Sequence, residues 1–404
     1  MRRLKKSWRW FGTGDPITLQ HLREMDIESV VTSLYNIPPG TIWDEASIEQ
    51  VQQLIEPYGM RWDVAESLPV SDDIKRRDGK YKEHIENYIV SLQNLAKRGV
   101  KTVCYNFMPA IDWVRTDLLF RLKNHGITMK FDYLKYVCFD LYILNRPNAE
   151  KDYDDSVKDK ARKLYKSMTE EEKHQLLDTI VVKTQAFIHG AKYSSTDDVR
   201  EVFLQSLSSY KGITRDILRN NLILFLKDVL PMAEKLGIKM ALHPDDPPFS
   251  VFGLPRIVST ADDLEWIFNQ CPAPSNGLTF CTGSFSAAPT NNVTELLNRF
   301  APRIYFAHLR NNILNEQGDF YESGHIQGTI NMVEVVKLLL REQQRRIEAG
   351  VQDCRIPFRP DHGIRILDDH TRNSAPGYPL IGRLKGLAEI SGIEEALLRI
   401  GVVA

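Results

Sequence analysis

The sequence predicts an α/β fold in which eight parallel strands close into a (β/α)₈ barrel. Short apolar runs alternate with longer amphipathic stretches, which is the pattern of repeated βα units. Several of the short runs, such as VVTSL, IKMAL and RIYFA, are almost continuously apolar, as expected for strands that are buried on both faces. One barrel with an insertion accounts for the 404 residues, because barrels of this kind begin at about 250 residues.

Each predicted strand is taken from such a run. In chain order the strands are Trp8–Phe11, Ser29–Leu34, Arg61–Glu66, Lys101–Phe107, Ile238–His243, Leu278–Cys281, Ile304–His308 and Ile356–Asp361. Helices are expected between most of them, in TLQHLREM (with Asp15-Pro16 as its start signal), SIEQVQQLIEPYG, HIENYIVSLQNLAKRG, LRNNLILFLKDVLPMAEKLG (ending at Gly237 as a C-terminal cap), TADDLEWIFNQC, NVTELLNRF and NMVEVVKLLLREQQRRIEAG, and a last one near Ile381–Ile400.

The region 111–219 departs from the βα alternation. It is rich in lysine, glutamate and aspartate, and the stretch SVKDKARKLYKSMTEEEKHQLLDTIV has helical periodicity. No Pro/Gly/Ser-rich linker separates it from its neighbours. We therefore predict a single domain over 1–404, with 111–219 as a mainly helical insertion after strand four.

Composition limits the possible functions. The formal net charge is −1, which argues against nucleic-acid binding because that needs a basic surface. The five cysteines are odd in number and scattered, so we expect a reducing, cytoplasmic compartment. Residues 1–7 are basic and are read as a solvated tail, since no apolar core of a secretory signal follows them, and no stretch is long and apolar enough for a membrane span.

Four consecutive predicted strands end on residues that bind metals well. They are His243, Cys281, His308 and Asp361. The C-terminal ends of the strands of a (β/α)₈ barrel converge on one mouth, so these side chains are expected to meet. Two imidazoles, a thiolate and a carboxylate suit a borderline ion such as Mn²⁺, Fe²⁺ or Zn²⁺ better than Mg²⁺ or Ca²⁺. Taken singly, each residue has a simpler reading as a core histidine, a small buried hydrophobe or a helix cap.

Other polar residues are expected near the same mouth. His362 follows Asp361 in a glycine-flanked loop, where it suits general acid/base chemistry or a supporting hydrogen bond. The remaining candidates for substrate contact are Glu66, Asn106, Arg310, His325 and Tyr378. Arg310 suits a substrate carboxylate, with salt bridges to the barrel's own acids as the alternative. For Asp245 and Asp246, a helix cap or a solvent-exposed position is as consistent with the sequence as a functional role.

Eight motifs together carry a resemblance to a known family. WRWFGTGDP, CYNFMPAIDW, HPDDPP, GLPRIVST, CTGS, RIYFAHLR, RPDHG and PGYPLIGRLKGL occur in this order from Trp8 to the last helix. In this set the chain resembles the mannonate dehydratases, which have a xylose-isomerase-like barrel. The resemblance implies a Mn²⁺- or Fe²⁺-dependent lyase, with Zn²⁺ also compatible, that dehydrates D-mannonate to 2-keto-3-deoxy-D-gluconate in hexuronate (glucuronate) catabolism. It implies the same four metal ligands, His362 and Tyr378 as acid/base residues, and a homodimer.

The chemistry explains why such residues are needed. The proton on C2 of mannonate is very weakly acidic, so the reaction needs stabilisation of the enediolate, a base for C2 and an acid for the departing C3 hydroxyl. The high unperturbed pKa of tyrosine, about 10, favours Tyr378 as the acid and His362 as the base. The sequence leaves open whether the substrate carboxylate binds to Arg310, Arg9, Arg383 or the metal alone. Two rival readings are an isomerase or epimerase for neutral sugars and a non-catalytic metal scaffold.

Overall fold

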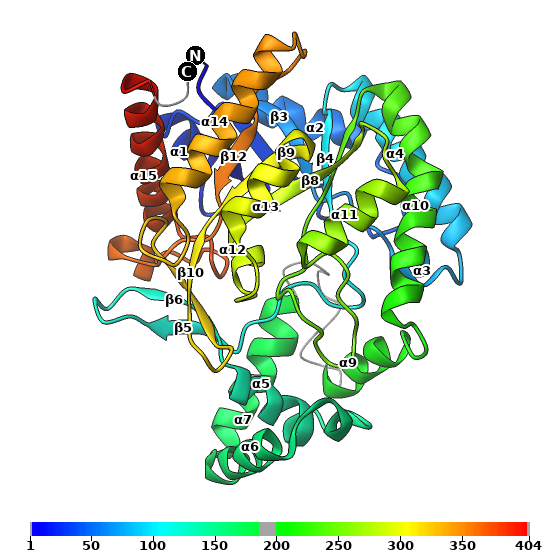
Figure 1. The fold of residues 1–404 in the computed structure, drawn as a ribbon, viewed down its shortest axis with the longest axis vertical. Coiled ribbons are helices and arrows are strands. Elements are labelled where there is room, and N and C mark those ends of the chain that lie inside the picture. Colours follow the sequence, from blue (N-terminus) through cyan, green and yellow to red (C-terminus); the bar gives the residue numbers. More distant parts are fainter. Residues whose placement is uncertain (1, 186–198, 402–404) are drawn as a thin grey trace.

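Eight parallel strands form a closed barrel in the computed structural model, which describes residues 2–185 and 199–401 (Figure 1). Around the barrel the strand order is β1-β12-β9-β8-β7-β4-β3-β2, and each neighbouring pair is parallel. The strands are β1 (Lys5–Arg9), β2 (Ser29–Thr32), β3 (Arg61–Glu66), β4 (Thr102–Tyr105), β7 (Lys239–Leu242), β8 (Asn276–Cys281), β9 (Ile304–Leu309) and β12 (Pro357–Pro360). The predicted fold class is confirmed.

The first strand corrects the sequence analysis. It begins at Lys5, whereas the prediction placed residues 1–7 in a solvated tail and began the strand at Trp8. Leu4 is fully buried, and the Ser7 hydroxyl donates to the carbonyl of Phe358 at 2.6 Å. The charge at Lys5 is accommodated because its Nζ reaches Asp63 at 3.1 Å. The basic residues therefore close the barrel against β12.

Helices cover the outside of the barrel. They are α1 (Leu19–Glu24), α2 (Glu45–Ile55), α4 (Tyr81–Lys97), α10 (Arg215–Leu236), α11 (Ala261–Gln270), α13 (Val293–Phe300), α14 (Met332–Glu348) and α15 (Leu380–Arg399). Gly237 caps α10 in the left-handed conformation, as predicted. Thr18 caps α1, whereas the prediction used Asp15-Pro16; Asp15 instead accepts the backbone N–H groups of Phe11 and Ile17 at 2.9 Å each.

A second sheet lies outside the barrel. Its strands β5 (Asp117–Arg121), β6 (Ile127–Phe131), β10 (Asn311–Leu314) and β11 (Phe320–Ser323) run in the order β10-β11-β6-β5 with antiparallel pairs. The sequence pattern predicts mainly helix from 111 onward and does not predict β5 or β6. These strands are short, and β6 pairs with a strand nearly two hundred residues away, so local periodicity carries little sign of them.

The described residues between β6 and α10 are mainly helical. It contains α5 (Tyr133–Cys138), η2 (Phe139–Ile143), η3 (Ala149–Asp152), α6 (Asp155–Ser167), α7 (Glu170–Leu177), η4 (Asp178–Lys183) and α9 (Val199–Ser208); residues 186–198 of the predicted insertion lie outside the described residues. The remaining short helices are η1 (Glu56–Tyr58), α3 (Asp72–Arg76), α12 (Thr282–Ser286), η6 (Ala301–Arg303) and η7 (Leu367–His370). No helix among the described residues is both long and apolar enough to cross a membrane.

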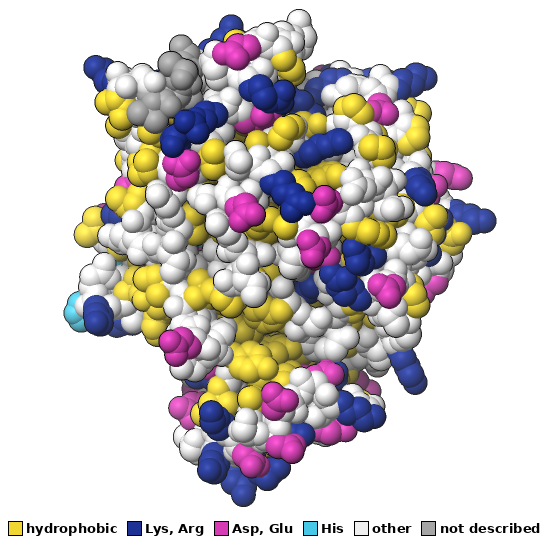
Figure 2. Space-filling model, viewed as in Figure 1, with side chains coloured by type: hydrophobic (Ala, Val, Ile, Leu, Met, Phe, Trp, Pro, Cys, Tyr) yellow, Lys and Arg dark blue, Asp and Glu magenta, His cyan; other side chains and the backbone are white. Residues whose placement is uncertain are grey.

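Two apolar cores hold these parts together. The larger one lies between the barrel and its helices, with Trp8, Leu92 and Phe280 among its fully buried members. The smaller one joins the helices after β6 to the β7–α11 loop and β11, through Phe139, Phe252 and Phe320. On the face in Figure 2, charges of both signs are interspersed over the barrel helices, and apolar side chains gather where the lower helical part meets the barrel.

We expect Gly382→Ala to destabilise the fold. Gly382 lies in the first turn of α15, and a Cβ there would be 1.9 Å from the carbonyl oxygen of Ile364, which belongs to the loop after β12. Relieving this contact requires a shift of the backbone. The free energy of unfolding, measured by chemical denaturation, should therefore fall by roughly 1–3 kcal/mol or more. Gly392→Ala in the same helix is the control: a Cβ meets nothing there, so stability should rise by about 0.5–1 kcal/mol. Equal effects of the two changes would contradict this packing.

Candidate functional site

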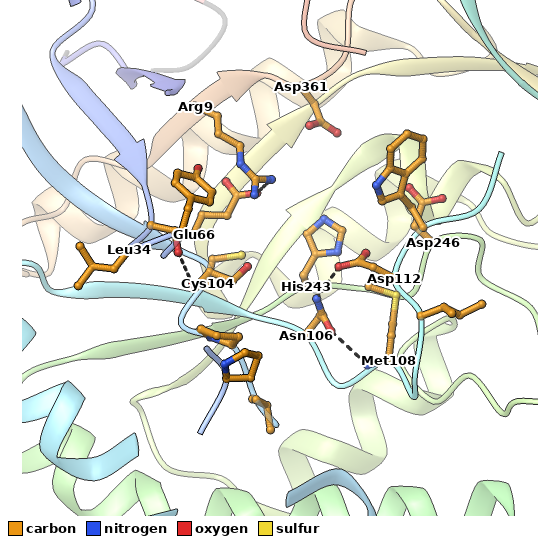
Figure 3. A pocket seen from close by; sticks show the side chains of 18 of the residues that line it. Arg9, Leu34, Glu66, Cys104, Asn106, Met108, Asp112, His243, Asp246 and Asp361 are labelled. Atoms are coloured by element: carbon orange, nitrogen blue, oxygen red, sulfur yellow. Dashed lines mark hydrogen bonds and ion pairs between the residues drawn. The ribbon is translucent and has the colours of Figure 1, made fainter. Parts of the chain in front are cut away.

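A cavity of about 460 Å³ opens at the C-terminal ends of the barrel strands (Figure 3). The segment after β4 forms part of its wall through Met108, Asp112 and Trp113. Its polar lining includes Arg9, Glu66, Asn106, Asp112, His243, Asp246, Arg310, Arg359, Asp361, His362 and Tyr378. A cavity of this size suits a small organic molecule.

Strand register brings three metal-binding donors to one point. Cys281 pairs with His308 across β8 and β9, and His243 follows β7 directly. One donor atom from each of these three residues lies within 4.8 Å of the others. Asp361 follows β12, and its Oδ2 lies 3.7 Å from the sulfur of Cys281. The structure thus brings three of the four predicted ligands to one point, and it places the fourth, Asp361, beside Cys281.

The two imidazoles present their lone pairs to a common space. His243 Nδ1 lies 2.7 Å from the carbonyl oxygen of Pro244, so it carries the proton and leaves Nε2 bare. His308 Nδ1 lies 3.4 Å from Nη2 of Arg359, which can only donate, so Nδ1 keeps its lone pair and the proton belongs on Nε2, 3.4 Å from Glu66 Oε2. The two bare nitrogens are 3.2 Å apart. Two lone pairs at this distance repel unless a cation lies near both, so the donors fit a bound metal ion.

Ion pairs fix the carboxylates around these donors. Arg359 donates to both oxygens of Glu66, at 2.8 and 3.1 Å, and also to Asp361. Arg9 adds a third contact to Glu66 at 2.9 Å. Burial opposes ionisation, but Arg359 and Arg9 hold the pKa of Glu66 well below its ordinary value, and Arg359, with His362 and Arg310, does the same for Asp361. Both groups are therefore charged acceptors held in place.

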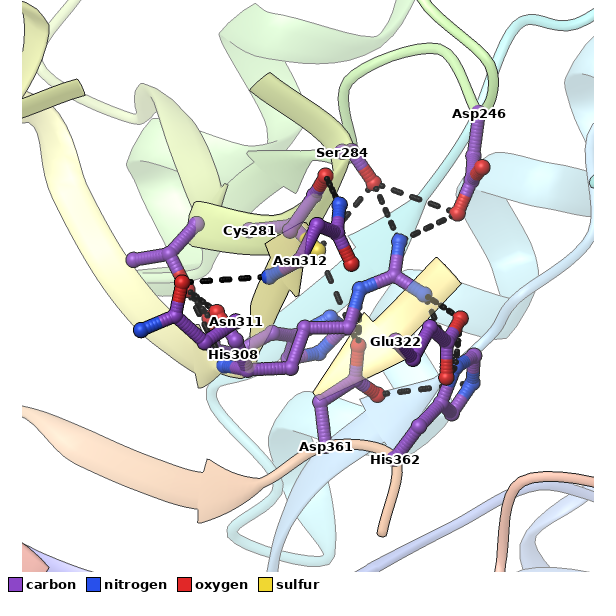
Figure 4. Close-up of polar contacts among 12 residues, drawn as sticks. Asp246, Cys281, Ser284, His308, Asn311, Asn312, Glu322, Asp361 and His362 are labelled. Atoms are coloured by element: carbon purple, nitrogen blue, oxygen red, sulfur yellow. Dashed lines mark hydrogen bonds and ion pairs between the residues drawn. The ribbon is translucent and has the colours of Figure 1, made fainter. Parts of the chain in front are cut away.

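Arg310 is the centre of a second group of ion pairs, whose acidic members Asp246, Glu322 and Asp361 are labelled in Figure 4. Its guanidinium contacts Asp246, Glu322 at 2.8 Å and Asp361 at 3.2 Å, and all four side chains are buried. Arg115 also binds Asp246, at 2.9 Å. These contacts agree with the second role predicted for Arg310, which is to form salt bridges with the barrel's own acids. Arg310 also lines the cavity.

His362 and Tyr378 lie side by side at the cavity wall. Their ring centroids are 5.0 Å apart, and both residues line the cavity. Gly377 has a left-handed backbone with φ of 81°, and a Cβ there would lie 3.0 Å from the His362 ring. Burial raises the pKa of Tyr378, although Arg359 and Arg9 oppose the shift. Tyr378 therefore keeps its proton at neutral pH.

Known proteins match this chain over almost its whole length. The sequence profile of the D-mannonate dehydratase (UxuA) family matches residues 4–402. The mannonate dehydratase of Chromohalobacter salexigens is 46% identical over 99% of this chain and 100% of that protein, and the mannonate dehydratase of Saccharophagus degradans is 42% identical over 98% of both chains. This chain belongs to the D-mannonate dehydratase family. The crystal structure of mannonate dehydratase from Streptococcus suis serotype 2 has a TM-score of 0.76 and 30% identity, covering 99% of this chain and 95% of that one.

In this member of the D-mannonate dehydratase family, some of the predicted substrate-binding residues line the cavity and others do not. Glu66, Asn106 and Arg310 line the cavity. His325 is buried outside the residues that line it and packs against Gly386 of α15; burial lowers the pKa of its ring to about 4. Arg383, one of the possible anion-binding groups, is buried outside the cavity lining and stacks 3.7 Å from the centre of the Trp8 ring.

Two acids next to the HPDDPP motif also have defined partners. Asp245 accepts the backbone N–H groups of Ile257 and Val258, at 2.7 and 2.6 Å. Asp246 binds Arg115 and Arg310, as described above. Neither is a solvent residue, because both are at least 96% buried, with exposures of 1% and 4%. Asp245 therefore fixes the loop before α11, whose helix cap is Thr260, and Asp246 belongs to the ion-pair group.

Sequence reasoning missed three residues with a place in the site. Arg359 precedes Asp361 by two positions in RPDHG, so its side chain points to the same side of β12, and that spacing is a usable signal. Glu322 lies on β11 and Arg115 lies just before β5. No local pattern marks these two, because their approach to the site depends on the unpredicted second sheet.

We expect Cys281→Ser to weaken metal binding by at least tenfold. A hydroxyl is a poorer ligand for a borderline divalent ion than a thiolate, while the small change at the fully buried Cys281 leaves the packing around it in place. Titration of chelator-stripped protein with Mn²⁺ would measure the affinity. Cys271→Ser is a matched control, since Cys271 is also a buried free cysteine but lies at the end of α11. Unchanged affinity in Cys281→Ser would remove this residue from the ligand set.

Proposed function

We propose that this protein dehydrates D-mannonate to 2-keto-3-deoxy-D-gluconate and water. The observation that carries the proposal is that His362 and Tyr378 line one cavity together with His243 and Asp361, while Cys281 and His308 lie within metal-ligand reach of His243. A purely structural metal would need no acid/base pair. The relatives named as mannonate dehydratases support the choice of substrate.

The metal we propose is Mn²⁺ or Fe²⁺, with Zn²⁺ also compatible with the donors. His243 would bind through Nε2 and His308 through Nδ1, together with the Cys281 thiolate and the Asp361 carboxylate. When bound, the ion supplies Lewis acidity that stabilises negative charge on substrate oxygens. Glu66 holds the tautomer of His308, because its carboxylate lies 3.4 Å from Nε2 and is itself held by Arg359 and Arg9.

The protein's own residues would move two protons. We assign the C2 proton to His362, because Glu322 contacts its Nδ1 and leaves Nε2, which lies 3.9 Å from Asp361 Oδ1, to accept a proton. The electron pair of the C2–H bond forms the C2–C3 double bond, and the C3–O bond breaks. Tyr378 gives its proton to the departing oxygen, which leaves as water. Burial keeps Tyr378 protonated until that step. The resulting enol then becomes the 2-keto acid.

The substrate carboxylate needs a cation at the cavity wall. Arg9 is our first choice, because it lines the cavity and contacts both Glu66 at 2.9 Å and the Tyr378 hydroxyl at 3.4 Å. Arg310 is retained as a second contact, although three carboxylates already surround it. Asn106 is proposed to bind a substrate hydroxyl, since its amide reaches Asp112 at 2.9 Å in the same wall.

The wider setting is proposed from the family. We infer a single domain with its insertion, a cytoplasmic homodimer, and a role in hexuronate (glucuronate) catabolism. The substrate class is a small sugar acid, with neither nucleic acid nor membrane as partner. The mixed charges on the face in Figure 2 agree with this assignment.

We expect chelator-stripped protein to lose turnover of D-mannonate and to regain it with Mn²⁺ or Fe²⁺. The assay would detect the 2-keto-3-deoxy acid, with Zn²⁺ as a third metal and neutral aldoses and ketoses as control substrates. His362→Asn should bind metal normally but lose roughly 10²–10⁴-fold in rate. Turnover of neutral sugars without dehydration of D-mannonate would replace the proposal with an isomerase or epimerase. Metal binding without any turnover would favour a scaffold.

A further inference from the structure

Glu322 lies outside the barrel but reaches into the site. It is on β11 of the second sheet, where the hydroxyl of Thr128 on β6 donates to its backbone carbonyl at 2.9 Å. Its carboxylate is 3% exposed and lies 2.8 and 2.9 Å from Nδ1 of His362 through its two oxygens. Figure 4 shows Glu322 and His362 side by side, next to Asp361. The second sheet therefore places a charged acceptor against the imidazole.

The contacts of Nδ1 decide which nitrogen of His362 carries the proton. Arg310 Nη1 also lies 2.8 Å from Nδ1, and it would need a bare nitrogen to donate to. Nη1 also donates to Glu322 Oε1 at 2.8 Å, so the guanidinium and the imidazole share this carboxylate as a neighbour. A bare Nδ1 would face two carboxylate oxygens at hydrogen-bond distance with no proton between them. Protonated Nδ1 donates to the carboxylate instead, which leaves the lone pair on Nε2.

Two arginines keep Glu322 charged and still. Arg115 Nη2 contacts Oε1 at 2.9 Å, and Arg310 contacts the same oxygen. Burial opposes the charge, but His362, Arg310 and Arg115 together lower the pKa of Glu322 to about 2. Arg115 is fully buried and lies between β4 and β5, so the segment after β4 supplies one of the two arginines that hold Glu322.

We propose that Glu322 is a positioning residue for His362: it holds the proton on Nδ1 and thereby makes Nε2 the nitrogen that accepts a proton from the substrate. In the reaction the imidazole gains the C2 proton on Nε2 and becomes a cation, which the adjacent carboxylate stabilises. The inference rests on the proposed function only where it names the C2 proton of D-mannonate as the proton that Nε2 accepts. The tautomer itself does not depend on it. β11 thus contributes to the proposed reaction by carrying Glu322, and the hairpin β5–β6 contributes by pairing with β11 and by following Arg115, which holds Glu322.

The tautomer can be measured without turnover. In metal-free protein labelled with ¹⁵N-histidine, the neutral ring of His362 should show a protonated Nδ1 and a bare Nε2, with His362→Gln used to assign the signal. In Glu322→Gln the amide N–H can donate to Nδ1, so the proton should move to Nε2. A wild-type ring protonated on Nε2 would overturn the proposal, and this measurement needs no variant to fold.

Kinetics give the second test. Glu322→Gln should lower kcat for D-mannonate by roughly 10²–10⁴-fold with little change in KM or metal content. Glu322→Asp should recover part of the loss, because it restores the charge. Glu342→Gln is the matched control: Glu342 is also buried and binds two arginines, Arg345 and Arg346, but lies on α14 away from the cavity.

The outcomes separate the two proposals. A normal kcat in folded Glu322→Gln would overturn the positioning role. So would a loss matched by Glu342→Gln, which would indicate general destabilisation. Wild-type protein that shows the Nδ1 proton, and moves it in Glu322→Gln, but does not dehydrate D-mannonate would leave the positioning role intact and refute the proposed function.

Discussion

The site depends on buried ion pairs in which guanidinium groups and carboxylates alternate. Glu66, Arg359, Asp361 and Arg310 follow one another in contact, and each is nearly fully buried. Burying one such charge alone is costly, and removing one partner of a buried pair typically costs about 3–5 kcal/mol. Each member therefore holds its neighbour in place. The candidate metal ligand Asp361 is held on both sides, so a cation at the donor set would meet a preorganised carboxylate.

The same ion pairs link parts of the chain that are distant in sequence. Glu66 ends β3, Arg359 lies in β12 and Arg310 follows β9, so the network crosses the barrel mouth. Through Glu322 and Arg115 it continues into the second sheet. This continuity gives the insertion a physical role, since it closes one wall of the cavity and its Arg115 holds Glu322, which contacts the proposed base His362. A barrel without the second sheet would leave His362 without that carboxylate.

Sequence reasoning succeeded where a residue's place follows from local pattern. Cys281, His308 and Asp361 come at or just after the ends of apolar strands, and strand ends of a closed barrel meet at one mouth. It failed where position depends on distant pairing. Glu322 reaches the site only because β11 pairs with β6, and Lys5 is in a strand only because β12 lies beside it. His325 was a reasonable candidate by position in the chain, yet its ring packs under α15.

The central claim is that one divalent ion binds to His243, Cys281, His308 and Asp361. X-ray absorption spectroscopy of Mn²⁺-loaded protein tests it most directly, because sulfur and nitrogen scatterers are distinguishable in the first coordination shell. The account predicts one sulfur ligand together with imidazole and oxygen ligands, and loss of the sulfur signal in Cys281→Ser. A shell of oxygen and nitrogen alone in the unsubstituted protein would contradict it.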